Sequence, residues 1–336
     1  KLSGDVSYKK INNLKNVNLK IQANQINLNN FIIYDMTANK KKQDIKNNIN
    51  QPKKESKSNI NRDIFSMLEG YNIYSNIKLN SIQYNDIIAK NIDFTLNKKE
   101  LLNLKLNIKD IFNGITQAEI KYFKNKKTDL FIDAKNIEIE KINNITKYNY
   151  LLGDIDLIAN INGDLKNKKT FKSSLNGEII LKNKNTSLNN INLVQLKNNI
   201  LNIKKLSEIT NINDGVFKGS TKIKRSKNSL TLKKGVLKLP STELDIDGET
   251  ITVQGNYNIE NNKINMDVFL NDKENLILSL FKIKLNGNLN NISTKVNYDN
   301  KKTEKIFKKA LKEKMQLIIK KKLDKKFNNL IENLLD

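Results

Sequence analysis

Apolar and polar residues alternate one by one through most of this chain, from about residue 71 to residue 298. The pattern is plain in residues 264–270 and 281–289. Successive side chains of a β-strand point to opposite faces of the sheet, so this period predicts strands with one apolar and one polar face. An apolar face has to be covered. Few segments have the spacing of a covering helix, so what fills the apolar face is the main question about function.

The connections between these segments are short and polar, as in residues 124–128, 183–187 and 260–263. Short connections favour antiparallel neighbours, and we expect about 15 strands in one meander. One strand is expected over residues 171–181, with Phe171, Leu175 and Ile179 on the same face. Another is expected over residues 217–223, with Phe217 and Ile223 on the same face.

Four regions follow from the composition along the chain. Residues 1–38 form a first β segment, and 39–62 a charged linker with few large apolar residues, typical of disorder. Residues 63–300 carry the meander, which opens on a short helical turn capped by Asp63. Within it, the apolar spacing of residues 193–210 favours a helix or a helical hairpin. Residues 301–336 predict a basic amphipathic helix, which would either cap an exposed sheet edge or lie on an anionic bilayer.

The chain contains no Cys, His or Trp. Activation of a nucleophile by His is therefore excluded, and a zinc centre is disfavoured. The carboxylate pairs Asp154/Asp156, Asp245/Asp247 and Glu138/Glu140 fall on the polar phase of their strands, where a solvated surface is the ordinary interpretation. We expect no catalytic residues, no metal and no cofactor, so the chain is predicted not to be an enzyme.

The formal net charge is +25, from 60 Lys and Arg against 35 Asp and Glu. Such a charge can indicate nucleic-acid binding. Here the cations are nearly all Lys and follow the polar phase of the strands, which indicates a solvated face. A basic surface also attracts anionic lipid head groups. No apolar run reaches the roughly 18 residues of a membrane-spanning helix. Because the chain opens on Lys1, we expect a fragment or a processed product.

Three architectures fit the alternation: a sandwich of two sheets, a closed barrel, and a long curled sheet with an open apolar side. The continuous meander and the scarcity of aromatic residues favour the third. The predicted fold is mainly β, a long antiparallel meander curled into an open groove or incomplete barrel, with the C-terminal basic amphipathic helix. The residues expected to line a lipid groove are Ile77, Leu79, Phe94, Leu104, Leu106, Ile120, Ile132, Leu157, Leu175, Ile179, Phe217, Ile223, Leu232, Ile246, Val268, Ile283 and Leu285.

Three stretches, taken in order, carry a family likeness. Residues 65–94 read as a turn, a strand and a hairpin, and residues 101–122 contain a Phe112-Asn113-Gly114 turn. Residues 151–196 contain Asn176-Gly177-Glu178-Ile179 and then Leu188-Asn189-Asn190-Ile191. In this order the segments resemble the C-terminal region of the AsmA family of bacterial envelope proteins. Asn189-Asn190 stands where that family usually has a charged residue followed by Gly.

The resemblance implies a periplasmic, groove-forming β protein, anchored in the inner membrane by a segment that this sequence lacks. It also implies binding or guiding of phospholipid acyl chains between inner and outer membrane, in support of outer-membrane lipid homeostasis and biogenesis. The expected partners are phospholipids, the inner membrane and outer-membrane assembly components, and no nucleic acid. The alternatives are a scaffold or regulator of outer-membrane protein assembly without transport and, ranked last, a basic nucleic-acid-binding β protein.

Overall fold

The computed structural model describes residues 2–12, 14–29, 68–146, 149–165, 168–203, 208, 211–212, 215–246, 249–270, 278–289, 291–299, 301–306, 308–309, 312, 316–317 and 319–320. The structure is mainly β, and 18 strands belong to one open mixed sheet. The chain divides into two compact units. Unit 1 comprises Lys1–Thr186, Arg225–Leu239 and Tyr257–Asn262, and unit 2 comprises Ser187–Lys224, Pro240–Asn256 and Lys263–Asp336.

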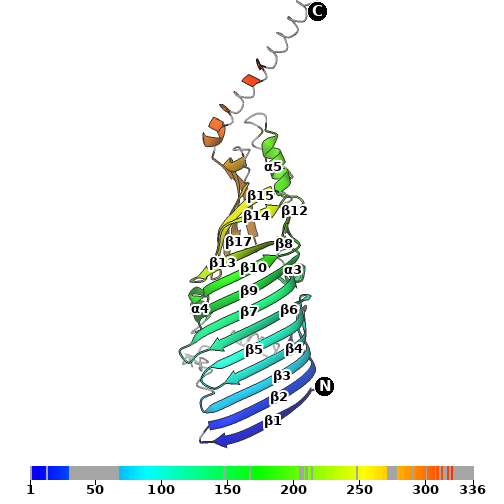
Figure 1. Cartoon of the computed structure of the whole chain (residues 1–336), viewed down its shortest axis with the longest axis vertical. Coiled ribbons are helices and arrows are strands. Elements are labelled where there is room, and N and C mark those ends of the chain that lie inside the picture. The colour runs from blue at the N-terminus through cyan, green and yellow to red at the C-terminus, as the bar shows by residue number, and fades with distance from the viewer. Residues whose placement is uncertain are drawn as a thin grey trace, which may run out of the picture. The chain divides into compact units, whose positions relative to one another are not determined.

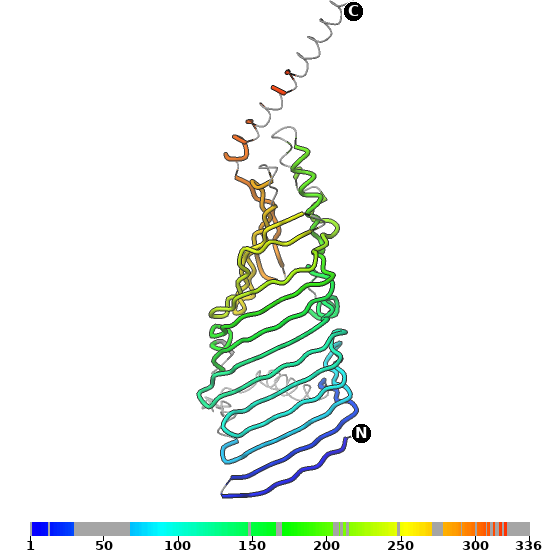
Figure 2. Tube along the Cα trace, viewed as in Figure 1, coloured from blue at the N-terminus to red at the C-terminus, as the bar shows by residue number. Residues whose placement is uncertain are grey.

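Unit 1 is a sheet of long strands, which lie side by side from the N-terminus onward in Figures 1 and 2. Ten strands pair in the order β1, β2, β3, β4, β5, β6, β7, β9, β10, β13. Their bounds are β1 (Leu2–Ile11), β2 (Leu14–Asn27), β3 (Tyr71–Tyr84), β4 (Ile87–Lys98), β5 (Leu102–Ile111), β6 (Gly114–Tyr122), β7 (Lys127–Glu138), β9 (Asp154–Asp164), β10 (Asn176–Asn183) and β13 (Ser226–Lys233), with the short β8 (Leu151–Leu152) before β9.

The pairing of β2 with β3 is parallel, whereas the other eight pairs of neighbouring strands in unit 1 are antiparallel. The prediction of a purely antiparallel meander is therefore wrong at this pair. A parallel pair needs a long connection, and residues 28–70 between β2 and β3 supply one. The parallel register sets asparagines side by side, with the Asn72 amide donating to Asn16 at 3.1 Å.

A helix and a turn replace parts of two predicted strands. The strand expected over residues 171–181 begins only at Asn176, because α4 (Lys168–Ser174) occupies its first half. The end of α4 is held against β9, where the Asp164 N–H donates to Ser174 Oγ at 2.7 Å. Similarly, the strand expected over residues 217–223 is only β12 (Ser220–Ile223), and Phe217 lies in a turn. The remaining helix of unit 1 that the structure describes is α3 (Ile139–Thr146).

Unit 2 has a fully buried core. Its α5 (Leu193–Leu201) starts at Asn192, whose side chain accepts from the Gln195 N–H at 2.8 Å, as an N-cap does. Leu193, Leu196 and Ile200 recur at helical spacing and are at most 1% exposed, in agreement with the helix predicted to begin at residue 193. The other elements are β11 (Thr186–Asn189), β14 (Val236–Ile246), β15 (Glu249–Asn258), β16 (Lys263–Leu270), a 3₁₀ turn η2 (Leu278–Leu280), β17 (Phe281–Asn288) and β18 (Asn291–Tyr298); β11 and β14 begin in unit 1, and β15 ends there.

The C-terminal segment is described only in part. Residues 301–306 are helical, and the helix begins where the Lys302 N–H donates to Asp299 Oδ1 at 3.0 Å. Lys308 forms an ion pair with Glu304 at 2.6 Å, one helical turn apart. Among the described residues, no helix is both long and apolar enough to cross a bilayer. The linker predicted at residues 39–62 and most of the turn predicted at 63–68 lie outside the described residues.

Candidate functional site: the apolar face of unit 1

The strand register of unit 1 aligns its apolar positions into rows that run across ten strands. Row A contains Gly4, Ile21, Ile77, Phe94, Leu106, Ala118, Ile132, Ala159, Ile179 and Leu230. Row B contains Val6, Leu19, Ser75, Leu96, Leu104, Ile120, Leu130, Ile161, Gly177 and Leu232. Row C contains Leu2, Ala23, Leu79, Ile92, Ile108, Thr116, Ala134, Leu157, Leu181 and Asn228.

These rows lie on one face of the sheet, which we call the apolar face. With strands about 4.8 Å apart, ten strands extend each row over about 43 Å. Many large side chains of the rows are only partly buried, among them Ile77, Phe94 and Leu106. In unit 2, by contrast, Phe281 and Val216 are 0% exposed. The two units therefore differ in degree. Of the fully buried large side chains that the structure describes, all but Leu232 lie in unit 2, whereas the rows of unit 1 have buried residues mainly in row C and leave many others partly exposed.

The predicted groove residues divide between the two units. Ten of them lie in rows A to C, namely Ile77, Phe94, Leu106, Ile132 and Ile179 in row A, Leu104, Ile120 and Leu232 in row B, and Leu79 and Leu157 in row C. Leu175 lies between α4 and β10 and is 9% exposed.

The other six predicted groove residues lie in unit 2. Three of them, Ile246, Val268 and Ile283, belong to its buried core, and Val268 pairs with Ile283. Ile223 pairs with Ile246, Leu285 pairs with Met266 on β16, and Phe217 is partly buried. The structure therefore does not bring these six into the rows of unit 1.

Sequence reasoning missed the polar residues on the apolar face, among them Ser75 and Lys98. Ser75 pairs with Leu19 and Leu96 in row B, and it is 3% exposed. Lys98 ends β4, pairs with Leu102 and is 6% exposed. The alternation could have placed Lys98 on the apolar face, because Phe94, Leu96 and Lys98 are spaced two residues apart and so point to the same side of the strand.

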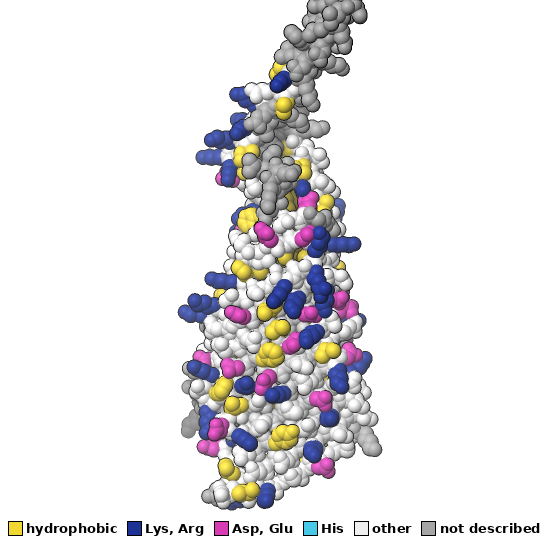
Figure 3. Space-filling model, viewed as in Figure 1, with side chains coloured by type: hydrophobic (Ala, Val, Ile, Leu, Met, Phe, Trp, Pro, Cys, Tyr) yellow, Lys and Arg dark blue, Asp and Glu magenta, His cyan; other side chains and the backbone are white. Residues whose placement is uncertain are grey.

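The polar face carries ion pairs between neighbouring strands. Lys78 of β3 pairs with Asp93 of β4 at 4.0 Å, and Lys90 of β4 pairs with Asp110 of β5 at 3.2 Å. Figure 3 shows a face on which Lys, Asp and Glu are interspersed over the strands, with scattered hydrophobic side chains between them. Such exposed pairs contribute at most about 1 kcal/mol each. Their arrangement is that of a solvated surface.

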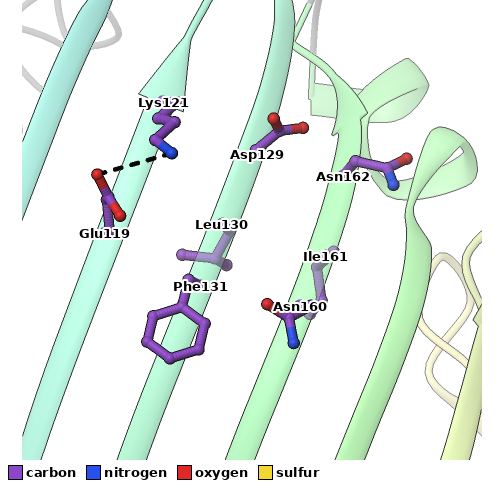
Figure 4. Close-up of a pocket in the computed structure, with 8 residues that line it drawn as sticks. All are labelled: Glu119, Lys121, Asp129, Leu130, Phe131, Asn160, Ile161 and Asn162. Atoms are coloured by element: carbon purple, nitrogen blue, oxygen red, sulfur yellow. Dashed lines mark ion pairs between the residues drawn. The ribbon is translucent and has the colours of Figure 1, made fainter.

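A shallow depression of about 270 Å³ lies over β6, β7 and β9 (Figure 4). Figure 4 shows Glu119 and Lys121, which are 3.9 Å apart, beside Phe131. These residues belong to the polar phase of their strands, in two cross-strand rows made of Glu119, Phe131 and Asn160 and of Lys121, Asp129 and Asn162. The depression is therefore on the side opposite rows A to C, and it gathers no set of groups arranged for acid–base chemistry.

Several carboxylates from the sequence pairs have structural partners. Asp156 forms an ion pair with Lys184 at 2.9 Å. Partial burial would raise the pKa of Asp156, but the Asn136 N–H and the Lys184 ammonium outweigh it and hold that pKa below its usual value. Glu140 accepts from the Gly153 N–H at 2.8 Å, and Asp245 pairs with Lys224 at 2.8 Å. Asp247 lies outside the described residues.

Comparison with protein-family models, with curated proteins and with solved structures finds no match to this chain. The resemblance to the AsmA family therefore stays a prediction. The site is defined by the geometry of unit 1 alone. It is a wide apolar face, partly exposed, with a buried ammonium group at one margin.

Proposed function

We propose that this chain binds phospholipid acyl chains on the apolar face of unit 1 and guides them along rows A to C. The observation that supports this most is the alignment of apolar side chains in register across ten strands, with most of those in rows A and B partly exposed. A protein that needed these residues only for its own core would bury them as unit 2 does. An acyl chain gains about 0.8 kcal/mol per buried CH₂, without any specific chemistry.

The charge of the chain favours an amphiphile with an anionic head over other apolar occupants. The formal net charge is +25, and basic surfaces attract anionic lipids over distances of about a Debye length. In this proposal the sheet of unit 1 forms an open groove. The basic segment 301–336 forms an amphipathic helix that lies on a bilayer surface, and its exposed Leu317 (61%) and Ile319 (54%) support that role.

The resemblance to the AsmA family supports a place in the bacterial envelope. There the chain would act in the periplasm between inner and outer membrane and contribute to outer-membrane lipid homeostasis and assembly. The alternative from the same family, a scaffold for outer-membrane protein assembly, predicts an apolar face that holds no lipid.

The test is lipid extraction and mass spectrometry of the purified protein, with a matched pair of variants. Leu106→Asp places a charge in row A, and Asn107→Asp places the same charge one residue further on the polar face. We expect phospholipid to co-purify with the wild type and with Asn107→Asp, and its amount to fall at least tenfold in Leu106→Asp, since burying a charge against acyl chains is costly.

Circular dichroism of both variants shows whether they stay folded. Where Leu106→Asp unfolds, Ile132→Asn in the same row replaces it. Wild-type protein that is folded but carries no phospholipid and takes none up from vesicles would contradict the proposal. Equal lipid content in Leu106→Asp and Asn107→Asp, both folded, would contradict the place assigned to the acyl chains.

A further inference from the structure

The apolar face of unit 1 differs at the two ends of its strands. At one end it carries lysines: Lys10 of β1 and Lys15 of β2 are register partners, and Lys98 ends β4. At the other end the register aligns Ile26, Ile82, Ala89 and Ile111, which pack into an apolar cluster. One end of the face is therefore basic and the other is apolar, the arrangement that an anionic amphiphile requires.

Lys98 is the most buried cation at the basic end. Its side chain is 6% exposed, and Nζ donates to the Tyr71 carbonyl oxygen at 2.7 Å. An ammonium has three N–H donors, and Lys98 forms no ion pair with any carboxylate of the described chain. Burial lowers the pKa of Lys98 and nearby Lys124 lowers it further, against an opposing effect of Glu69. An anion bound at Nζ would raise the pKa of Lys98 by its opposite charge and so oppose both lowering effects.

Two buried hydroxyl groups on the same face make no hydrogen bond to any described residue. Ser75 Oγ is one, and Ser75 is 3% exposed. Ser75 lies two residues beyond Ile73, the partner of Lys98, so it is a diagonal neighbour at about 7 Å between Cβ atoms. Thr128 Oγ1 is the other, in the cross-strand row of Lys98, Leu102 and Tyr122. Buried polar groups without partners are uncommon in folded proteins and suggest a missing ligand.

We infer that Lys98 binds the anionic head group, a phosphate or a carboxylate, of an amphiphile whose acyl chain extends from Lys98 over the partly exposed Leu96 and Phe94 of β4. The inference rests on the proposed function, because it needs an acyl chain on the apolar face. The five residues from Lys98 to Phe94 span about 13 Å of strand. Ser75 contributes a further donor beside the head group. Bound lipids are thus oriented, with their heads at the Lys98 end of the strands.

The test uses three ligands that share a twelve-carbon chain and differ in the head: dodecyl phosphate, dodecanoate and dodecyl maltoside. Binding of each below its micellar concentration is measured by calorimetry on the whole chain. The variants are Lys98→Met, Lys98→Arg and the matched control Lys78→Met, which removes a cation from the polar face of β3, where Lys78 is 62% exposed. Wild type should bind at least one of the two anionic ligands at least tenfold more tightly than the maltoside.

Lys98→Met should lose that preference and keep its affinity for dodecyl maltoside, whereas Lys98→Arg and Lys78→Met should keep the preference. If the preference that depends on Lys98 is larger for dodecyl phosphate, the site is assigned to phospholipids. If it is larger for dodecanoate, the site is assigned to fatty acids. Equal wild-type affinity for all three ligands, or a preference that survives Lys98→Met, overturns the inference and leaves the proposed function standing. Failure of all three ligands, and of phospholipid vesicles, to bind wild type overturns both.

Discussion

Gly153, between β8 and β9, shows how backbone geometry restricts single residues of unit 1. Its φ is +102°, and a Cβ atom there would lie 1.8 Å from the Asn185 carbonyl oxygen. Its N–H donates to Glu140, and its carbonyl accepts from the Ile139 N–H at 2.9 Å. The residue therefore combines a conformation that favours glycine with a close approach of two backbones. Any side chain would have to displace the neighbouring segment.

Gly153→Ala should lower the free energy of unfolding by about 3 kcal/mol or more, because strain and steric overlap add. The matched control is Gly70→Ala. Gly70 also has a positive φ, +75°, but a Cβ atom there would meet nothing within 4 Å. The Gly70→Ala variant should lose about 1–2 kcal/mol of unfolding free energy, because its only cost is the backbone conformation with a positive φ. Urea denaturation of both measures the difference, and equal midpoints would contradict the steric part of the argument.

At the scale of elements, four neighbouring strands change their alternation at the same place. Along β3 the apolar positions run Ile77, Leu79, Ile82, with a step of three after Leu79. The register aligns this step with the same step in β2, β4 and β5, at Ala23/Ile26, Ala89/Ile92 and Ile108/Ile111. Opposite β6, the step in β5 coincides with a β-bulge between Ile108 and Ile111. Because all four strands change their alternation at the same position, the apolar residues on both sides of the step stay on one face.

Deletion of Asn80 should restore strict alternation in β3 and thereby break its match with both neighbours. Ile82 would then turn away from Ile26 and Ala89, which costs about 2–3 kcal/mol for one large apolar side chain. Asn80→Ala keeps the length of the strand and should cost much less, since the Asn80 side chain makes only an exposed contact to Asn24 at 3.4 Å. Thermal unfolding of the two variants measures the difference in their stability. A deletion variant as stable as Asn80→Ala would contradict the importance of the shared change in alternation.

At the scale of the whole molecule, unit 1 and unit 2 bury their apolar residues to different degrees. Leu196, Val216 and Phe281 of unit 2 are 0% exposed, so unit 2 has no need of a ligand to complete its core. Rows A and B of unit 1 keep mostly partly exposed side chains, whereas much of row C is buried. A ligand that binds only the folded form stabilises it by about 2.7 kcal/mol at a hundredfold excess over Kd. That stabilisation should be concentrated where the ligand lies.

Amide hydrogen exchange with and without dodecyl phosphate tests this distribution. We expect slower exchange in β3 to β7 of unit 1 when the ligand is present, and little change in α5 and β17 of unit 2. Dodecyl maltoside at equal saturation is the control for general binding to apolar surface. Equal slowing in both units, or slowing confined to unit 2, would contradict the assignment of the ligand to the apolar face of unit 1.

Much of this architecture follows from local patterns. The alternation predicted a mainly β chain and the phase of most strands, and ten of the predicted groove residues lie in rows A to C. The predicted strand boundaries were wrong where tertiary contacts determine the local structure and the alternation does not. At α4, for example, Ser174 and Phe171 pack against the end of β9. Alternation also could not reveal the parallel β2–β3 pair, whose partners are 56 residues apart.

By itself, the sequence determined that this chain has strands with an apolar side, because side-chain direction in a strand is a local property with a period of two. Only the tertiary structure decided which of those sides are closed and which stay partly open. Burial depends on partners that are distant along the chain, so Ile283 and Ile132 read alike as sequence, yet one is 1% exposed in the core of unit 2 and the other lies partly exposed in row A. The same register placed the buried ammonium of Lys98 at the margin of the apolar face.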